Sequence, residues 1–267
     1  MRSQNDKRHR NAFPAFALLS RVFRVHGMDF SQEELIDAIE RIVAGLLERA
    51  GIAEPPVDAL HIAEEHLGIP VEVAEPEEDE EPRRRPRRPS GAGIVLSPGM
   101  TRQQQQKTAA EGIARALVPE VLRRLDVAHG SENRQFAAHV VGLMAPRILI
   151  PTRLLRQALK EHKFDVAALQ KVFATVTMEV MALRLLDLDE PCVIAIADDG
   201  VVAIRRSNRF AATKKLEPAE EACLAQVMEV DLPHRVRQGS WTVYGWPVAE
   251  RPFQRVILRA VRDDDGV

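Results

Sequence analysis

The sequence predicts an α+β fold, and three observations support that prediction. Between residues 31 and 187, apolar side chains recur every three or four positions, which is the period of an amphipathic helix. After Pro191 the pattern changes to an alternation that is typical of strands. Asp198-Asp199-Gly200 separates two of these alternating runs and is a strong hairpin signal. We therefore expect a mainly helical domain over residues 28–190, followed by a smaller α+β domain over residues 191–267.

The N-terminal segment differs from the rest of the chain. Residues 1–27 contain six lysines and arginines but one acid, Asp6. No continuous apolar segment with a small-residue cleavage site is present, so the composition does not indicate a secretory signal. We expect a disordered basic extension, with Met28 opening the folded domain.

The sequence predicts two helices and a short strand between residues 31 and 73. Ser31, followed by acids in the first turn, predicts the N-cap of a helix that extends to about residue 49 and ends at Gly51. A second helix over residues 57–67 leads into a short strand at residues 71–73.

A charged insertion interrupts the chain at residues 75–92. Five glutamates and one aspartate fall within residues 75–81, and five arginines within residues 83–88, with prolines interspersed. Such a segment cannot bury enough apolar surface to offset its ordering entropy. We expect a flexible loop that precedes a strand at residues 93–96.

Five further helices are expected at about residues 103–126, 132–144, 151–160, 166–174 and 177–186. The last two have the spacing of a helix-turn-helix, which raises a DNA-binding alternative. The second of them, however, presents Thr177, Glu179, Arg184 and Asp187 to the outside, a poor surface for phosphate groups. We prefer the interpretation in which both helices pack within the helical domain.

The C-terminal domain is expected to contain a helix over residues 218–228, capped from Glu217, and four strands at residues 192–197, 201–204, 241–248 and 254–260. Trp241, Tyr244 and Trp246 all fall in the third of these strands. Such a cluster is more often core or a sheet face than a platform for a ligand or peptide.

Composition excludes several classes of protein. The formal charge of −2 gives no global attraction to nucleic acid, and no run of eighteen apolar residues exists that could span a membrane. Cys192 and Cys223 are too few for a disulfide framework or a zinc ribbon. We therefore expect a cytoplasmic protein that binds neither membrane nor, directly, nucleic acid.

Two neighbouring motifs carry a family resemblance. They are Lys107-Thr108-Ala109-Ala110-Glu111-Gly112-Ile113-Ala114-Arg115 and the stretch from Glu132-Asn133-Arg134-Gln135-Phe136 to Leu143-Met144-Ala145-Pro146. Together they resemble the core of the ImmA/IrrE metallopeptidases, and the resemblance extends over roughly residues 30–190. It implies a zincin-like module with a small edge sheet. In that family the first motif reads close to A-H-E-x-x-H, and an acid from the second is the third zinc ligand.

Both histidine positions of that motif are alanine here, Ala110 and Ala114. Residues four apart on a helix share one face, but a methyl group offers no lone pair to a metal. Hydrolytic zinc normally takes three protein ligands and a water. The resemblance therefore implies that Glu111 is a vestigial general base, and we expect no cofactor; zinc would be present only if the protein is active.

Other residues offer only a weak substitute for the lost ligands. Glu132 and His139, seven apart, lie nearly on one helical face and with Glu111 could form a mixed metal site. His61 and His66, five apart, would diverge by about 140° on an α-helix and could not share an ion. We expect these two to face solvent.

Three functions remain open from the sequence. The leading hypothesis is a catalytically inactive ImmA/IrrE-like protein that binds a regulatory partner, and the family implies a helix-turn-helix repressor as that partner. The second is a working zinc endopeptidase with non-standard ligands that cleaves such a repressor. The third is a DNA-binding or scaffold protein that retains only the fold.

Overall fold

The computed structural model describes residues 23–25, 28–74, 93–127, 134–249 and 253–263. Within them, helices and three sheets combine into a mixed architecture, which confirms the predicted α+β class. Residues 1–22 and 26–27 of the expected basic extension, the charged insertion at residues 75–92 and Glu132 lie outside the described residues, so the expectations for them remain predictions.

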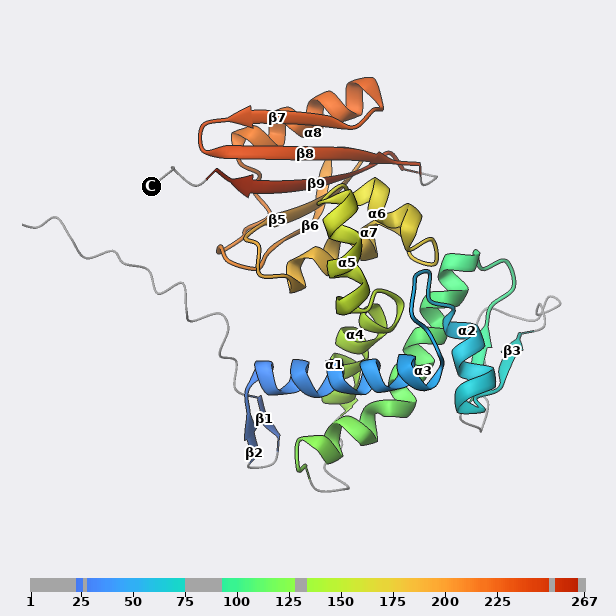
Figure 1. The fold of residues 1–267 in the computed structure, drawn as a ribbon. Coiled ribbons are helices and arrows are strands. Elements are labelled where there is room, and N and C mark those ends of the chain that lie inside the picture. The colour runs from blue at the N-terminus through green and yellow to red at the C-terminus, as the bar shows by residue number, and fades with distance from the viewer. Residues whose placement is uncertain (1–22, 26–27, 75–92, 128–133, 250–252, 264–267) are drawn as a thin grey trace, which may run out of the picture.

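The N-terminal half is mainly helical (Figure 1). Its elements are β1 (Phe23–Val25), β2 (Met28–Phe30), α1 (Gln32–Arg49), α2 (Ala59–His61), the π-helix η2 (Ile62–His66), β3 (Val71–Val73), β4 (Ile94–Leu96), α3 (Arg102–Arg124), α4 (Arg134–Leu149), α5 (Thr152–His162), α6 (Val166–Val172), α7 (Met178–Arg184) and the 3-10 helix η3 (Leu185–Asp187). Among the described residues no single helix is long and apolar enough to cross a membrane, and only the pair α4 and α5, bent by 49°, meets those criteria jointly.

The C-terminal elements are β5 (Val193–Asp198), β6 (Val201–Ser207), α8 (Pro218–Val230), β7 (His234–Gln238), β8 (Trp241–Val248) and β9 (Arg255–Arg262). Their strands form one antiparallel sheet in the order β6-β5-β9-β8-β7. Helix α8 covers one face of this sheet, and α7 lies against β5 and β9 on the other.

Strict alternation along these strands divides their side chains between two hydrophobic clusters. Ile194, Ile196, Trp246 and Ile257 belong to the same cluster as the cores of α1, α3 and α4. The intervening residues, including Val243 and Leu258, pack with α8 in a second cluster. The sheet is therefore shared: one face completes the helical core, and the other is covered by α8.

Helix α1 begins where the sequence predicts. The Ser31 side chain accepts a hydrogen bond from the Glu34 N–H at 3.1 Å, and Glu34 Oε2 accepts one from the Ser31 N–H at 2.7 Å. This capping box satisfies two backbone donors of the first turn. The helix buries Leu35, Ile39 and Leu46 on one face, as its apolar period predicts.

Four local predictions are wrong. Residues 23–25 of the predicted disordered extension form β1, which pairs antiparallel with β2. Helix α4 does not end at Met144 but continues through Pro146 to Leu149. The strand β7 was missed because its sequence, HRVRQ, is polar at every position except Val236, as suits an exposed edge strand. The segment over residues 57–67 becomes a short α-helix followed by a π-helix rather than one α-helix.

The π-helix changes the geometry of two histidines. The wider π-helical turn brings residues five apart onto one face, so the rings of His61 and His66 lie edge to face with centroids 5.4 Å apart. The expected 140° divergence is therefore wrong, because it assumed α-helical geometry. Both residues are exposed, which confirms that they face solvent.

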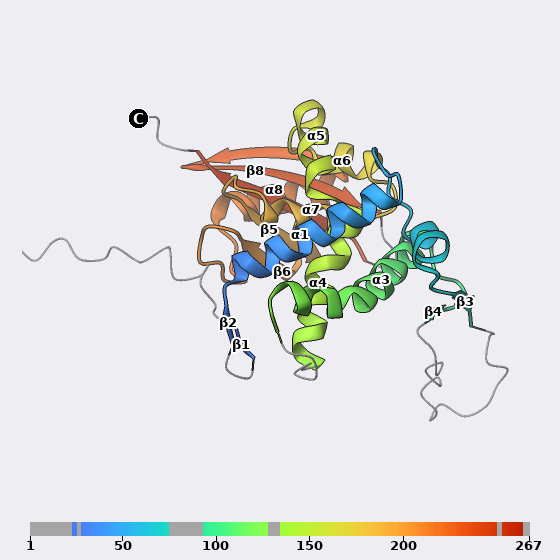
Figure 2. The ribbon, with the colours of Figure 1, turned by 60° about the horizontal axis from the view of Figure 1, so that its bottom comes forward.

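Figures 1 and 2 both place α2, β3 and β4 at the side of the molecule remote from the five-stranded sheet. Strands β3 and β4 pair in parallel, with Val71 opposite Ile94. Helix α3 packs against β4, α2, α1 and α4, and so lies at the centre of the helical half.

Candidate functional site

Helix α3 carries the motif that resembles a metallopeptidase helix, and side-chain hydrogen bonds hold its N-terminal end. Thr101 and Gln104 form a capping box at its N-terminus. One turn on, the buried Gln106 donates a hydrogen bond to Asp58 Oδ1 at 2.7 Å and accepts one from the Ala59 N–H at 2.6 Å. Although burial acts to raise it, hydrogen bonds from Gln106 and the His61 N–H hold the pKa of Asp58 below its usual value.

Ala110 and Ala114 are both 0% exposed and belong to the hydrophobic cluster of the helical half. The positions that would carry zinc-binding imidazoles therefore face packed apolar side chains. Close by, a Cβ on Gly112 would lie 2.4 Å from Ile94 Cγ1, so α3 and β4 approach closely. The two alanines therefore lie within the apolar core, and neither has a side chain that could bind a metal.

Glu111 lies on the outer side of the same helix. Its carboxylate is one-third exposed and forms ion pairs with Lys107 at 3.8 Å and Arg115 at 3.3 Å. Both partners are one helical turn away, which is the usual arrangement of a stabilising pair on a helix surface. The geometry thus gives Glu111 two cationic partners on the helix surface.

Of the two weak substitute ligands, the structure describes His139 but not Glu132. Within the described residues, no group of three histidine, cysteine, aspartate or glutamate side chains could hold a metal ion. His139 is half-buried on α4, and burial lowers its pKa, which favours neutral imidazole. Because Glu132 lies outside the described residues, the mixed site of Glu111, Glu132 and His139 remains a prediction.

The α6–α7 pair does not present a recognition helix. Every residue from Thr177 to Arg184 is buried or half-buried, because α7 packs against α4, β5 and β9. Glu179 turns toward the sheet and pairs with Arg255 at 3.1 Å. Arg184, predicted to face outward, is 2% exposed and donates hydrogen bonds to the carbonyl of Ile150. A helix that enters a DNA groove must expose one face, and no residue of α7 is more than partly exposed.

A pocket opens on the helical face of the five-stranded sheet. Its volume is about 580 Å³, and it lies between the loop that joins α5 to α6 and strands β7, β8 and β9. Tyr244 and Trp246 stack with centroids 6.3 Å apart on its wall, and Arg259 reaches it from β9. The sequence predicted the strand that carries the two aromatics but assigned no binding role to the arginine. The sequence did contain a signal for its role, because Arg259 is the one charged residue within the otherwise apolar run of residues 256–261.

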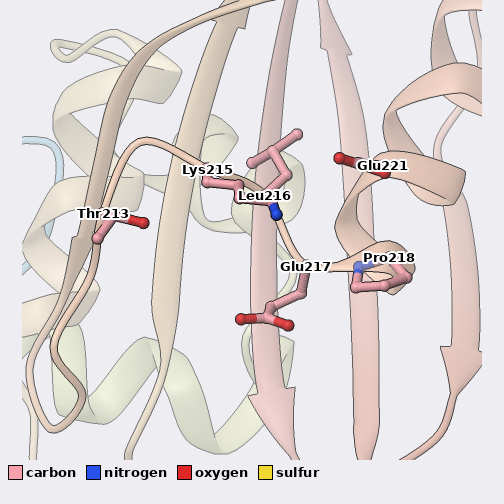
Figure 3. A pocket seen from close by; sticks show the side chains of 6 residues that line it. All are labelled: Thr213, Lys215, Leu216, Glu217, Pro218 and Glu221. Atoms are coloured by element: carbon pink, nitrogen blue, oxygen red, sulfur yellow. The ribbon is translucent and has the colours of Figure 1, made fainter.

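A second hollow, of about 370 Å³, lies at the start of α8 (Figure 3). It is lined by Thr213, Lys215, Leu216, Glu217, Pro218 and Glu221, which belong to the preceding loop and the first helical turn. The Glu217 N–H donates to Glu220 Oε2 at 2.8 Å in a capping box. Glu220 is buried and also pairs with Arg205 at 2.8 Å. These contacts stabilise the N-terminus of α8, and we assign no binding site to this hollow.

Both cysteines are buried, as their apolar surroundings in the sequence predict. Burial raises the pKa of the Cys223 thiol to about 11. It also raises the pKa of Cys192, against the opposing charge of Arg259. A thiol with a raised pKa is a poor nucleophile at neutral pH, so neither cysteine is a catalytic candidate.

Comparison with known proteins gives a fold but no family. No protein-family profile matches the sequence, and no curated protein matches it. A solved structure of a Mycobacterium tuberculosis transcriptional regulator is similar, with a TM-score of 0.62 and 15% sequence identity. The similarity covers 86% of this chain and 80% of that one. At this identity the likeness establishes a common fold over both the helical half and the sheet.

Proposed function

We propose that this protein is a regulatory member of the ImmA/IrrE type that binds a protein partner without cleaving it. The observation that carries the proposal is the burial of Ala110 and Ala114 in the apolar core, where the type requires two metal-binding imidazoles. Zinc supplies the hydroxide for peptide hydrolysis in such enzymes, and a lone carboxylate at Glu111 does not replace it.

A regulatory role accords with the structural neighbour, which is itself a transcriptional regulator. The partner we propose is a helix-turn-helix repressor held through protein contacts, with no direct role for nucleic acid. The proposal includes a cytoplasmic location and no resident cofactor. A DNA-binding role through α6 and α7 has little support, because no residue of α7 is more than partly exposed.

The first experiment asks whether Glu111 acts in catalysis. In cells that lack the gene, wild-type protein and Glu111→Gln should restore the same pattern of gene expression, measured by RNA sequencing. The matched control is Glu120→Gln, which removes another ion-paired carboxylate from the surface of α3. Loss of complementation by Glu111→Gln alone, at equal protein level, would support a working peptidase, because the general base would then be required.

The second experiment measures the metal directly. Elemental mass spectrometry of the purified protein should find far less than one equivalent of zinc, and added zinc should not produce cleavage of an unfolded substrate such as β-casein. Stoichiometric zinc with specific cleavage would refute the proposal. The variant Ala110→His with Ala114→His should not gain zinc. Instead it should be destabilised, by about 1–3 kcal/mol per site, because the imidazoles would overpack the core.

A further inference from the structure

The pocket on the helical face of the sheet contains more positive charge than its surroundings neutralise. Its lining includes Lys163, Arg235 and Arg259, together with two histidines, His162 and His234. Asp165 is the one acid among the described lining residues, and its carboxylate accepts hydrogen bonds from the N–H groups of Ala167 and Ala168 at the start of α6. The pocket therefore has an electrostatic preference for an anion.

Arg259 is the residue of the pocket that is best placed to bind an anion. It is 6% exposed, and its Nε has no hydrogen-bond partner among the described residues. The guanidinium is hydrogen-bonded to the Cys192 thiol and lies near the Tyr244 hydroxyl and, with a weaker effect, Glu190. None of the ion pairs within the described residues includes it. Burying a guanidinium that has no ion-pair partner is costly, and a planar fork of donors suits a carboxylate or a phosphate.

Each of the two arginines of the pocket lies over an aromatic ring. Arg259 Cζ lies 4.1 Å from the centre of the Phe164 ring, and Arg235 Cζ lies 5.2 Å from the centre of the Tyr244 ring. Tyr244 and Trp246 are nearly parallel, with an interplanar angle of 18°. Trp246 is buried, whereas Arg235 is exposed at the mouth. An anion held by the arginines would thus lie beside a wall that favours a flat apolar group.

We propose that this pocket binds a small molecule that carries an anionic group on a planar ring. The anion pairs with Arg259 and Arg235, and the ring packs against Tyr244 and Phe164. A volume of about 580 Å³ lies within the usual range for small-molecule sites. The inference goes beyond the proposed function and does not depend on it, because it concerns the sheet and not α3.

Binding can be measured with matched charged and neutral probes. Calorimetry would compare 2-naphthoate with 2-naphthamide, and adenosine monophosphate with adenosine, so that the two arms separate a carboxylate from a phosphate. At least one anionic probe should bind, at least about tenfold more tightly than its neutral analogue, because the charge-assisted hydrogen bonds are lost in the latter. In a Trp241→Phe background, Trp246 becomes the sole tryptophan and its fluorescence should report the same binding.

Variants assign the binding to the pocket. Arg259→Met should lower the affinity for the anionic probe by about tenfold or more, and Arg235→Gln should lower it by about three- to tenfold. The matched control is Arg237→Gln, which removes the same charge from β7 at a position that pairs with Asp263 and does not line the pocket. Because Arg235 is exposed, its variant keeps the test valid if Arg259→Met does not fold.

Three results would overturn the assignment. The first is equal affinity for charged and neutral probes, and the second is equal weakening of binding by Arg237→Gln and Arg235→Gln. The third is no binding of any anionic probe at about millimolar concentration, where even weak sites are populated. None of these results bears on Glu111, so failure here leaves the proposed function untouched. Conversely, zinc-dependent cleavage by the protein would leave this pocket assignment intact.

Discussion

Arg184 is a residue whose role could not be inferred from its neighbours in sequence. It is 2% exposed and donates hydrogen bonds to the Ile150 carbonyl, to Thr152 Oγ1 at 2.8 Å and to Asp187. Arg147, also buried, pairs with Glu40 at 3.1 Å and with Asp187 at 3.2 Å. Two guanidiniums and two carboxylates thus join α1, α4, α5 and α7, and each charge is compensated inside the fold.

Replacing Arg184 by methionine should destabilise the protein by about 3 kcal/mol, because two acids would lose a buried counter-charge while keeping partial hydration. Urea unfolding followed by circular dichroism measures the change. The control is Arg156→Met, whose exposed partner Asp189 lies 3.5 Å away, and which should cost no more than about 1 kcal/mol. Equal effects of the two substitutions would mean that the buried network contributes nothing beyond a surface pair.

At the scale of the element, the contact between α3 and β4 shows how a glycine sets a packing distance. A Cβ at Gly112 would stand 2.4 Å from Cγ1 and 2.8 Å from Cδ1 of Ile94. The helix can therefore lie directly on the strand only while position 112 has no side chain. The same motif, taken as a helix-propensity pattern, gives no reason for a glycine there.

Gly112→Ala should lower the free energy of unfolding by about 1–3 kcal/mol, because overpacking outweighs the gain in helix propensity. Gly142→Ala is the control, since a Cβ at that exposed position of α4 meets nothing within 4 Å and should stabilise by about 0.5–1 kcal/mol. Thermal and urea denaturation would measure both. In a double-mutant cycle with Ile94→Ala, the loss of unfolding free energy caused by Gly112→Ala should be smaller than in the wild-type background. An equal loss in both backgrounds would mean that the added methyl group does not clash with Ile94.

At the scale of the whole molecule, the five-stranded sheet is part of the helical core as well as the base of its own smaller core. Ile194, Ile196 and Ile257, each at most 1% exposed, pack into the cluster that includes α1, α3 and α4. Removing either half would expose this surface. The sheet and the helices should therefore unfold together.

Urea unfolding should give one coincident transition by tryptophan fluorescence, which reports the sheet, and by far-ultraviolet circular dichroism, which reports mainly the helices. Ile257→Ala should shift both curves equally, at a cost of about 2–5 kcal/mol, because it leaves a cavity at the shared face. Two separate transitions, or a shift confined to the fluorescence curve, would show that residues 191–267 unfold as an independent unit.

Much of the fold could be predicted from the sequence because it depends on local patterns. The capping box at Ser31, the turn at Gly200 and the limits of β8 all follow from residues close together in the chain. The π-helix at residues 62–66 and the edge strand β7 could not, since neither has a distinctive period of its own. For the site, Ala110 and Ala114 were found from the motif, whereas Arg235 and Phe164 were not.

The sequence alone determined which chemistry the motif on α3 can support, because the number of lone pairs at residues 110 and 114 depends on residue type and not on conformation. It also determined the α+β class, since the change of period after Pro191 is a property of the chain. Tertiary structure decided whether those alanines border a cleft or a core, and it placed Arg259 beside Phe164 and Tyr244. Such placements depend on contacts between residues far apart in sequence, which no local pattern encodes.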